Sequence, residues 1–145
     1  MRLITLAVGA FTILSLVADR SIWDGVYTEE QSKRGERVYA DTCANCHAPD
    51  LTGGQVVPAL TGDEFLNKWN GTTAGDLFDQ IRMTMPQDNP GTLTSRQYAD
   101  VLAYIFKRNK FPAGRNDLEA DLDTLNAIRL ERSRKPARNR VFHIV

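Results

Sequence analysis

Apolar residues along this chain recur mainly at the spacing of one face of a helix. The clearest stripe stands at positions i, i+3, i+4 and i+7 and consists of Tyr98, Val101, Leu102 and Ile105. Apolar and polar residues nowhere alternate for long enough to indicate a strand of a sheet. The pattern therefore predicts an all-α fold.

Four helix starts are marked by a threonine that is followed three residues later by an acidic or amide residue, which is the spacing of a capping box. The threonines are Thr28, Thr61, Thr73 and Thr94. The helices that we expect after them cover residues 28–41, 65–68, 77–82 and 98–108, and a fifth, weaker helix covers residues 122–130.

Glycine- and proline-rich loops separate these helices at residues 51–62 and 85–93. About five short helices form a thin core for so much loop, because irregular segments need a surface to pack against. A large buried prosthetic group would supply that surface.

The composition is that of one globular domain with modest extras, since 42% of the 145 residues are hydrophobic and 25% are charged. The net charge of zero hides an asymmetry. Residues 19–128 carry 11 basic and 17 acidic side chains, whereas residues 129–145 carry six basic side chains and one acidic one. We expect the acidic part to attract basic partner surfaces and the basic tail, residues 132–145, to be disordered.

The N-terminal segment, residues 1–18, joins Arg2 to an apolar run of sixteen residues. That run is short for a membrane span and suits an export signal cleaved after Ala18. A retained membrane anchor and a buried helix are the alternatives. A signal or an anchor would place the remaining chain outside the cytoplasm, where thiols oxidise unless they are otherwise committed.

The only two cysteines stand in the sequence Cys43-Ala44-Asn45-Cys46-His47. This pattern is C-x-x-C-H, the attachment motif of a c-type haem. Each thiol adds across a vinyl group of the porphyrin, and the following histidine supplies an axial imidazole to the iron. We therefore expect one haem c, held covalently by Cys43 and Cys46 and ligated by His47.

Three other sites would use the same cysteines. A zinc site needs four ligands, and the only further histidine is His143 in the basic tail. A thioredoxin-type redox pair would need a βαβ context, which is missing. A disulfide across two residues would be strained and would stabilise little.

The second axial position of the iron has two methionine candidates, Met83 and Met85. Met85 precedes Pro86, and prolines would hold a ligand loop in an extended shape against the haem face. Met83 lies nearer the preceding helix and is a candidate core residue. Met85 is therefore the favoured ligand, with Met83, an open iron or ligation by His143 as the alternatives.

Several motifs make the chain resemble a class I c-type cytochrome of the small periplasmic mono-haem type. They are CANCH (43–47), PAL (58–60), NKWNG (67–71), TMPQDNPGTL (84–93) and YADVLAYIFKRNKFPAG (98–114). The last two resemble those of cytochromes found beside periplasmic quinoprotein dehydrogenases. The resemblance covers about residues 22–114 and implies a cytochrome c fold.

Roles for particular residues follow from this resemblance. Gly35 and Tyr39 match the face of the N-terminal helix that contacts the C-terminal helix. The carbonyl of Pro58 matches the acceptor for the imidazole N–H of His47. Trp69 matches a donor to a haem propionate, with a packed indole as the alternative. Met85 matches the distal ligand.

Two segments depart from the family pattern. Residues 115–131 form an extension with one candidate helix, which either docks a partner or is merely solvated. The motif WDGVY, residues 23–27, is expected to wrap the surface of the domain at residues 19–114.

An iron with both axial positions filled cannot bind a substrate, so the expected function is electron transfer and not catalysis. The resemblance implies redox partners such as a periplasmic dehydrogenase as donor and an oxidase or another cytochrome as acceptor, with no nucleic acid. A membrane tether through the N-terminus is left open. The alternatives are a dedicated haem subunit of a dehydrogenase complex and a gas-binding sensor or peroxidase with an open iron.

Overall fold

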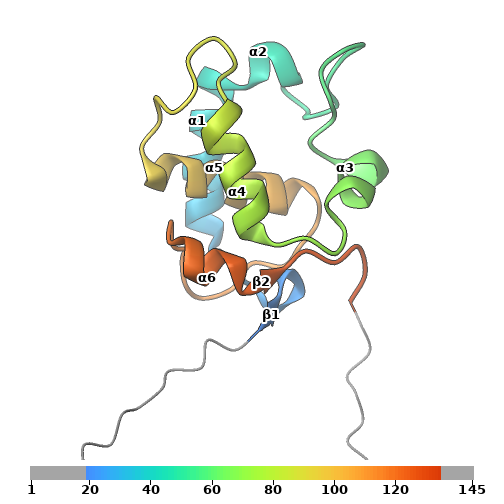
Figure 1. Cartoon of the computed structure of the whole chain (residues 1–145), viewed down its shortest axis with the longest axis vertical. Coiled ribbons are helices and arrows are strands. Elements are labelled where there is room, and N and C mark those ends of the chain that lie inside the picture. Colours follow the sequence, from blue (N-terminus) through green and yellow to red (C-terminus); the bar gives the residue numbers. More distant parts are fainter. Residues whose placement is uncertain (1–18, 135–145) are drawn as a thin grey trace, which may run out of the picture.

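The computed structural model describes residues 19–134, which form an α-helical domain (Figure 1). Its helices are α1 (Glu29–Thr42), α2 (Ala44–His47), α3 (Gly62–Trp69), α4 (Ala74–Thr84), α5 (Ser95–Arg108) and α6 (Leu122–Asn126), preceded by a 3-10 turn at Ile22–Asp24. The strands β1 (Arg20–Ser21) and β2 (Ile128–Arg129) have two residues each. The all-α prediction is confirmed.

The centre of the domain is the crossing of α1 and α5. A Cβ atom placed on Gly35 of α1 would lie 1.8 Å from the carbonyl oxygen of Asp100 and 3.0 Å from the Cβ of Tyr104, so only glycine allows this approach. Tyr39 of α1 packs on Tyr104 with ring centroids 5.3 Å apart. The contact face expected from the resemblance is therefore present.

Two of the four expected capping boxes are complete. In the boxes of Thr73 and Thr94 the threonine hydroxyl accepts from the third backbone N–H, and the third side chain accepts from the threonine N–H. Thr28 accepts from the N–H of Gln31, but the Gln31 amide bonds Leu118 instead. The box predicted at Thr61 is wrong, because its side chain accepts no hydrogen bond from the first turn of α3; the hydroxyl donates to the carbonyl of Arg108 instead.

The helix expected at residues 122–130 ends early. Helix α6 stops at Asn126, and the next residues form β2, which pairs in parallel with β1. Thr73 extends this contact through an antiparallel bridge to Arg129. The segment therefore ties the two ends of the described chain together.

Both segments that depart from the family pattern belong to the core, contrary to their expected place on the surface. In the WDGVY segment Val26 and Tyr27 are buried. The extension buries four large apolar side chains, those of Leu118, Leu125, Ile128 and Leu130. Because these side chains join one cluster with α5, the extension is part of the domain and is not a solvated appendage.

The first residue of the basic tail, Arg132, contacts α3 and the residue that follows it. Arg132 donates hydrogen bonds to the side chains of Asp63 and Asn67 on α3, and its N–H donates to Asn70 at 2.9 Å. The expected export signal or anchor at residues 1–18 and the tail from residue 135, including His143, lie outside the described residues. Within residues 19–134, no helix has both the length and the apolar character needed to cross a membrane.

Candidate haem site

The two cysteines flank a single helical turn. Helix α1 ends at Thr42, and α2 carries Cys46 and His47. The N–H groups of Cys46 and His47 both donate to the carbonyl of Cys43, at 3.2 and 3.0 Å. Both cysteines are free thiols, with Cys43 half-buried and Cys46 exposed, and burial raises the pKa of the Cys43 thiol. The turn thus presents two unpaired sulfurs beside one imidazole.

His47 is held by a main-chain acceptor. The residue is only 7% exposed, and Nδ1 lies 3.0 Å from the carbonyl oxygen of Pro58. When Nδ1 donates to this carbonyl, Nε2 keeps a free lone pair. Nε2 makes no hydrogen bond within residues 19–134, where every fully buried side-chain nitrogen or oxygen has a partner. Nε2 therefore faces solvent-accessible space, as a metal ligand requires.

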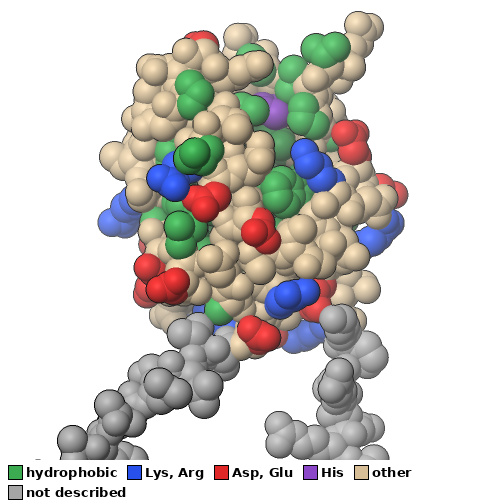
Figure 2. Space-filling model, in the orientation of Figure 1, with side chains coloured by type: hydrophobic (Ala, Val, Ile, Leu, Met, Phe, Trp, Pro, Cys, Tyr) green, Lys and Arg blue, Asp and Glu red, His purple; other side chains and the backbone are tan. Residues whose placement is uncertain are grey.

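Apolar side chains gather around this imidazole. Figure 2 shows the histidine in a recess among hydrophobic side chains on one face of the described domain. Leu51 is fully buried, and Leu60 packs at the edge of the core. A flat apolar ring system would be shielded from water in such surroundings.

The loop between His47 and Pro58 is closed by its own hydrogen bonds. The N–H of Gly53 donates to the carbonyl of His47 at 3.0 Å. Gly53 has a φ of 71°, and a Cβ there would lie 2.3 Å from the carbonyl oxygen of Val57. Tyr39 donates its hydroxyl to the carbonyl of Ala48 at 2.7 Å. The carbonyl of Pro58 is thereby brought back to the histidine.

The structure separates the two methionine candidates. Met83 lies on the outer side of α4 with 66% of its surface exposed. Met85 caps the end of α4, is half-buried and begins the loop through a cis peptide bond to Pro86. Its N–H donates to the carbonyl of Ile81 at 2.8 Å, and its carbonyl accepts from the hydroxyl of Tyr98 at 2.8 Å. Met83 is therefore not the core residue that its helical position suggested.

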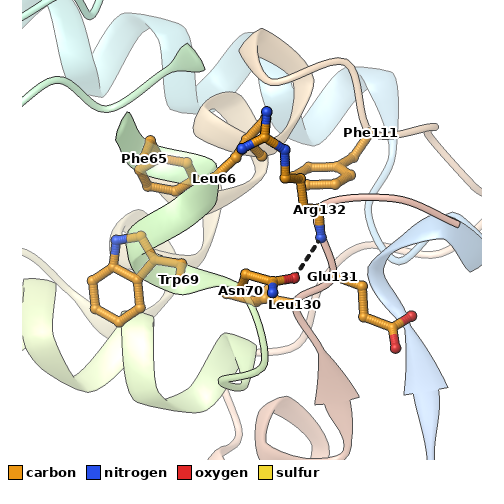
Figure 3. Close-up of a pocket in the computed structure, with 8 residues that line it drawn as sticks. All are labelled: Phe65, Leu66, Trp69, Asn70, Phe111, Leu130, Glu131 and Arg132. Atoms are coloured by element: carbon orange, nitrogen blue, oxygen red, sulfur yellow. Dashed lines mark hydrogen bonds between the residues drawn. The ribbon is translucent and has the colours of Figure 1, made fainter. Parts of the chain in front are cut away.

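Trp69 ends α3 and is half-buried. Its ring contacts Phe65 at a centroid distance of 6.5 Å, and the Lys68 ammonium lies 5.5 Å from its centroid. Figure 3 shows it at one side of a small pocket, with Phe111 and Arg132 at the other. Its indole nitrogen forms no hydrogen bond with the described part of the chain, so packing and donation to an added acceptor are both compatible with its surroundings.

The ligands offered here fit haem iron and do not fit zinc. Residues 19–134 contain no group of three histidine, cysteine or acidic side chains that would hold a metal ion. They do contain two free thiols next to an imidazole with an open Nε2, and a half-buried thioether begins the loop after α4. An imidazole and a thioether are the axial pair typical of cytochromes c.

A comparison with known families decides the identity. Residues 30–105, more than half of the chain, match the family model described as cytochrome c oxidase, cbb3-type, subunit III. The chain belongs to this cytochrome c family. As a class I c-type cytochrome it uses a haem c iron for electron transfer.

Other comparisons add little to the cytochrome assignment. No curated protein sequence matches the chain at a significant level. Among solved structures, the sulfane dehydrogenase SoxCD from Paracoccus pantotrophus contains a chain that is 18% identical, with a TM-score of 0.49. The match covers 87% of this cytochrome and 68% of that chain.

Proposed function

We propose that this cytochrome is an exported carrier of single electrons. One haem c is attached to Cys43 and Cys46, with His47 and Met85 as axial ligands. The observation that carries the proposal is the contact of His47 Nδ1 with the Pro58 carbonyl at 3.0 Å, because it fixes the tautomer and leaves Nε2 open to a metal.

The bound haem would supply a reversible change between Fe(III) and Fe(II). The chain's own residues tune this change. A hydrogen bond from Nδ1 to Pro58 orients the imidazole and raises its basicity. The Met85 thioether, a soft neutral ligand, favours the ferrous state. The apolar surroundings act in the same direction, because they disfavour the extra positive charge of the ferric state.

The choice of Met85 over Met83 rests on position and burial. Met83 is 66% exposed on α4 and is not part of the buried core. Met85 is half-buried and held by two main-chain hydrogen bonds. With both axial positions filled, the iron takes no substrate or gas, which supports a carrier over a sensor or peroxidase.

A periplasmic location is supported by the apolar segment at residues 1–18, as an export signal or a membrane tether. We propose a periplasmic dehydrogenase as electron donor and an oxidase or another cytochrome as acceptor. The acidic side chains of residues 19–128 would attract a basic partner surface, an effect that added salt weakens. Because the matching family is described as an oxidase subunit, a dedicated subunit of one redox complex is the second candidate.

The deciding experiment is spectroscopy of the chain made in a host that exports and ligates haem. The pigment should stay with the protein in acidified organic solvent, and Cys43→Ala or Cys46→Ala should weaken that attachment. The oxidised protein should show the weak far-red band of sulfur ligation. That band should disappear in Met85→Ala and persist in Met83→Leu.

Two results would contradict the proposal. Release of the pigment into the solvent would rule out covalent attachment. Carbon monoxide binding by the reduced wild-type protein at neutral pH would show an open iron and favour a sensor or peroxidase. Purification of the chain only as a tight complex with a dehydrogenase or oxidase would support the dedicated subunit over a diffusing carrier.

A further inference from the structure

We infer that Tyr98 is a positioning residue for the distal ligand, Met85, an inference that rests on the proposed axial pair. The two residues are thirteen positions apart, on different elements, and the Tyr98 hydroxyl donates to the Met85 carbonyl at 2.8 Å. Together with the bond from the Met85 N–H to the Ile81 carbonyl at 2.8 Å, this fixes both main-chain polar groups of Met85. Its side chain is the part left free to reach the iron.

The loop after Met85 offers little other restraint. Within residues 86–92, the hydrogen bonds join loop residues to one another, from the Asn89 N–H to the Pro86 carbonyl and from the Thr92 hydroxyl to the Asn89 carbonyl. Most of this loop is exposed. The bonds to Ile81 and Tyr98 are therefore the connection of this ligand segment to the packed domain.

Tyr98 is itself rigidly placed. It is 1% exposed and stands in the first turn of α5, whose start is fixed by the complete capping box of Thr94 and Gln97. Its ring meets Phe78 of α4 edge-on, with centroids 6.3 Å apart. The hydrogen bond from its hydroxyl thus holds the Met85 backbone in a fixed position relative to α4 and α5.

A restraint of this kind matters because a neutral thioether is a weak ligand that competes with stronger external ones. A ligand already held in place loses less conformational freedom when it binds the metal. Loss of the Tyr98 hydroxyl should therefore make Met85 easier to displace, while the sulfur and its surroundings stay the same.

The chain offers a matched control in Tyr27. Tyr27 is also 1% exposed and donates its hydroxyl to a main-chain carbonyl, that of Phe111, at 2.6 Å. This bond ties the segment before α1 to the segment after α5 and involves neither His47 nor Met85. Tyr27→Phe and Tyr98→Phe therefore delete the same kind of hydrogen bond, and only the second bond restrains the proposed ligand.

The test compares imidazole binding to the oxidised holoproteins of wild type, Tyr98→Phe and Tyr27→Phe. Loss of the far-red band reports the binding. Tyr98→Phe should bind imidazole roughly three- to tenfold more tightly, the change expected for one lost hydrogen bond. Its reduction potential should also fall, because weaker thioether ligation favours Fe(II) less. Tyr27→Phe should match wild type in both measurements, even if its stability decreases.

Equal behaviour of Tyr98→Phe and Tyr27→Phe would overturn the inference and leave the proposed axial pair intact. A wild-type protein without the far-red band, or one whose band survives Met85→Ala, would overturn both. Circular dichroism of the two variants establishes that each retains its helices, so a difference in imidazole affinity reports on the ligand.

Discussion

Gly35 and Asp100 approach each other so closely that a methyl group on Gly35 would lie 1.8 Å from the Asp100 carbonyl oxygen. Because the obstacle is backbone, the helices must separate to admit even alanine. We expect Gly35→Ala to lower the free energy of unfolding by about 3 kcal/mol or more. Denaturant unfolding followed by circular dichroism measures this.

Gly54→Ala is the control for that substitution. Apart from its chain neighbours, Gly54 has no described heavy atom within 4 Å of a built Cβ, and its φ is not in the left-handed region. We expect a change of less than about 0.5 kcal/mol. Equal effects at the two glycines would show that α1 and α5 do not cross as closely as described.

The extension after residue 114 should be needed for the stability of the whole domain. Leu125 of α6 is fully buried, so Leu125→Ala should cost about 2–5 kcal/mol, the range for a large-to-small substitution in a core. Leu122, one turn earlier on the same helix, is 36% exposed, and Leu122→Ala should cost less than about 1 kcal/mol. Thermal unfolding of both variants checks this, and two small effects would contradict the packing of α6.

Tyr27 should make the domain sensitive to base. Burial, and secondarily the carboxylate of Glu29, raises the pKa of Tyr27 from 10.0 to about 12. The unfolded chain therefore loses this proton first, and stability falls as the pH rises through that interval, by about 2–3 kcal/mol. Tyr27→Phe removes this contribution.

The measurement is the free energy of unfolding of wild type and Tyr27→Phe from about pH 9 to about pH 12. At the lower pH the variant should be less stable by about 1 kcal/mol, because it lacks the bond to Phe111. The difference should shrink and then reverse at the higher pH. Curves that stay parallel would show that Tyr27 does not titrate with unfolding.

Arg34 forms salt bridges with two acidic residues that should contribute unequally to stability. It bonds Asp100, whose side chain is 6% exposed, and Asp117, whose side chain is 41% exposed. A hydrogen bond from the Thr28 hydroxyl, and secondarily Arg34, lowers the pKa of Asp117. The stabilisation that ionised Asp117 gives the fold is therefore lost only as the pH falls below about 4. We expect Asp100→Asn to cost about 1–3 kcal/mol and Asp117→Asn less than about 1 kcal/mol at neutral pH.

Unfolding of these two variants at neutral pH provides the test. A larger loss of stability for Asp117→Asn than for Asp100→Asn would contradict the prediction that Asp100 is the more important partner of Arg34. At low pH the wild type and Asp117→Asn should converge, because the protonated carboxyl no longer pairs with Arg34.

The parts of the fold with strong local signals were predictable from the sequence. The apolar stripe at Tyr98–Ile105 and the capping boxes of Thr73 and Thr94 predicted α4 and α5. The box at Thr61 does not form, and its hydroxyl is directed instead toward the carbonyl of Arg108, 47 residues away. A spacing rule does not detect a contact with so distant a residue.

Other elements have no local signal strong enough to detect. Helix α2 has four residues, fewer than the periodicity of a helix needs to be seen. The pairing of β1 with β2 joins two-residue segments about 108 positions apart in the chain. The WDGVY segment packs on residues more than 75 positions later, through contacts of Tyr27 with Phe106 and Phe111, so the local sequence pattern did not reveal its burial.

The residues of the proposed site also fall into those that the sequence predicted and those that it did not. The C-x-x-C-H pattern marks Cys43, Cys46 and His47 within five residues, and Pro58 followed from the family resemblance. Tyr98 was recognised as a core residue of α5, but the bond of its hydroxyl to Met85 depends on how α4 and α5 meet. A buried tyrosine needs an acceptor, which is the one sequence signal that would have raised the question.

The β1–β2 pair also determines how the protein can be handled. It brings the first and last described residues to one pole of the domain, while α2 lies at the opposite pole (Figure 1). A label attached beside residue 19 or residue 134 would therefore lie at the pole opposite α2. Held at that pole, the domain would turn the segment that carries Cys43 and Cys46 toward the solution.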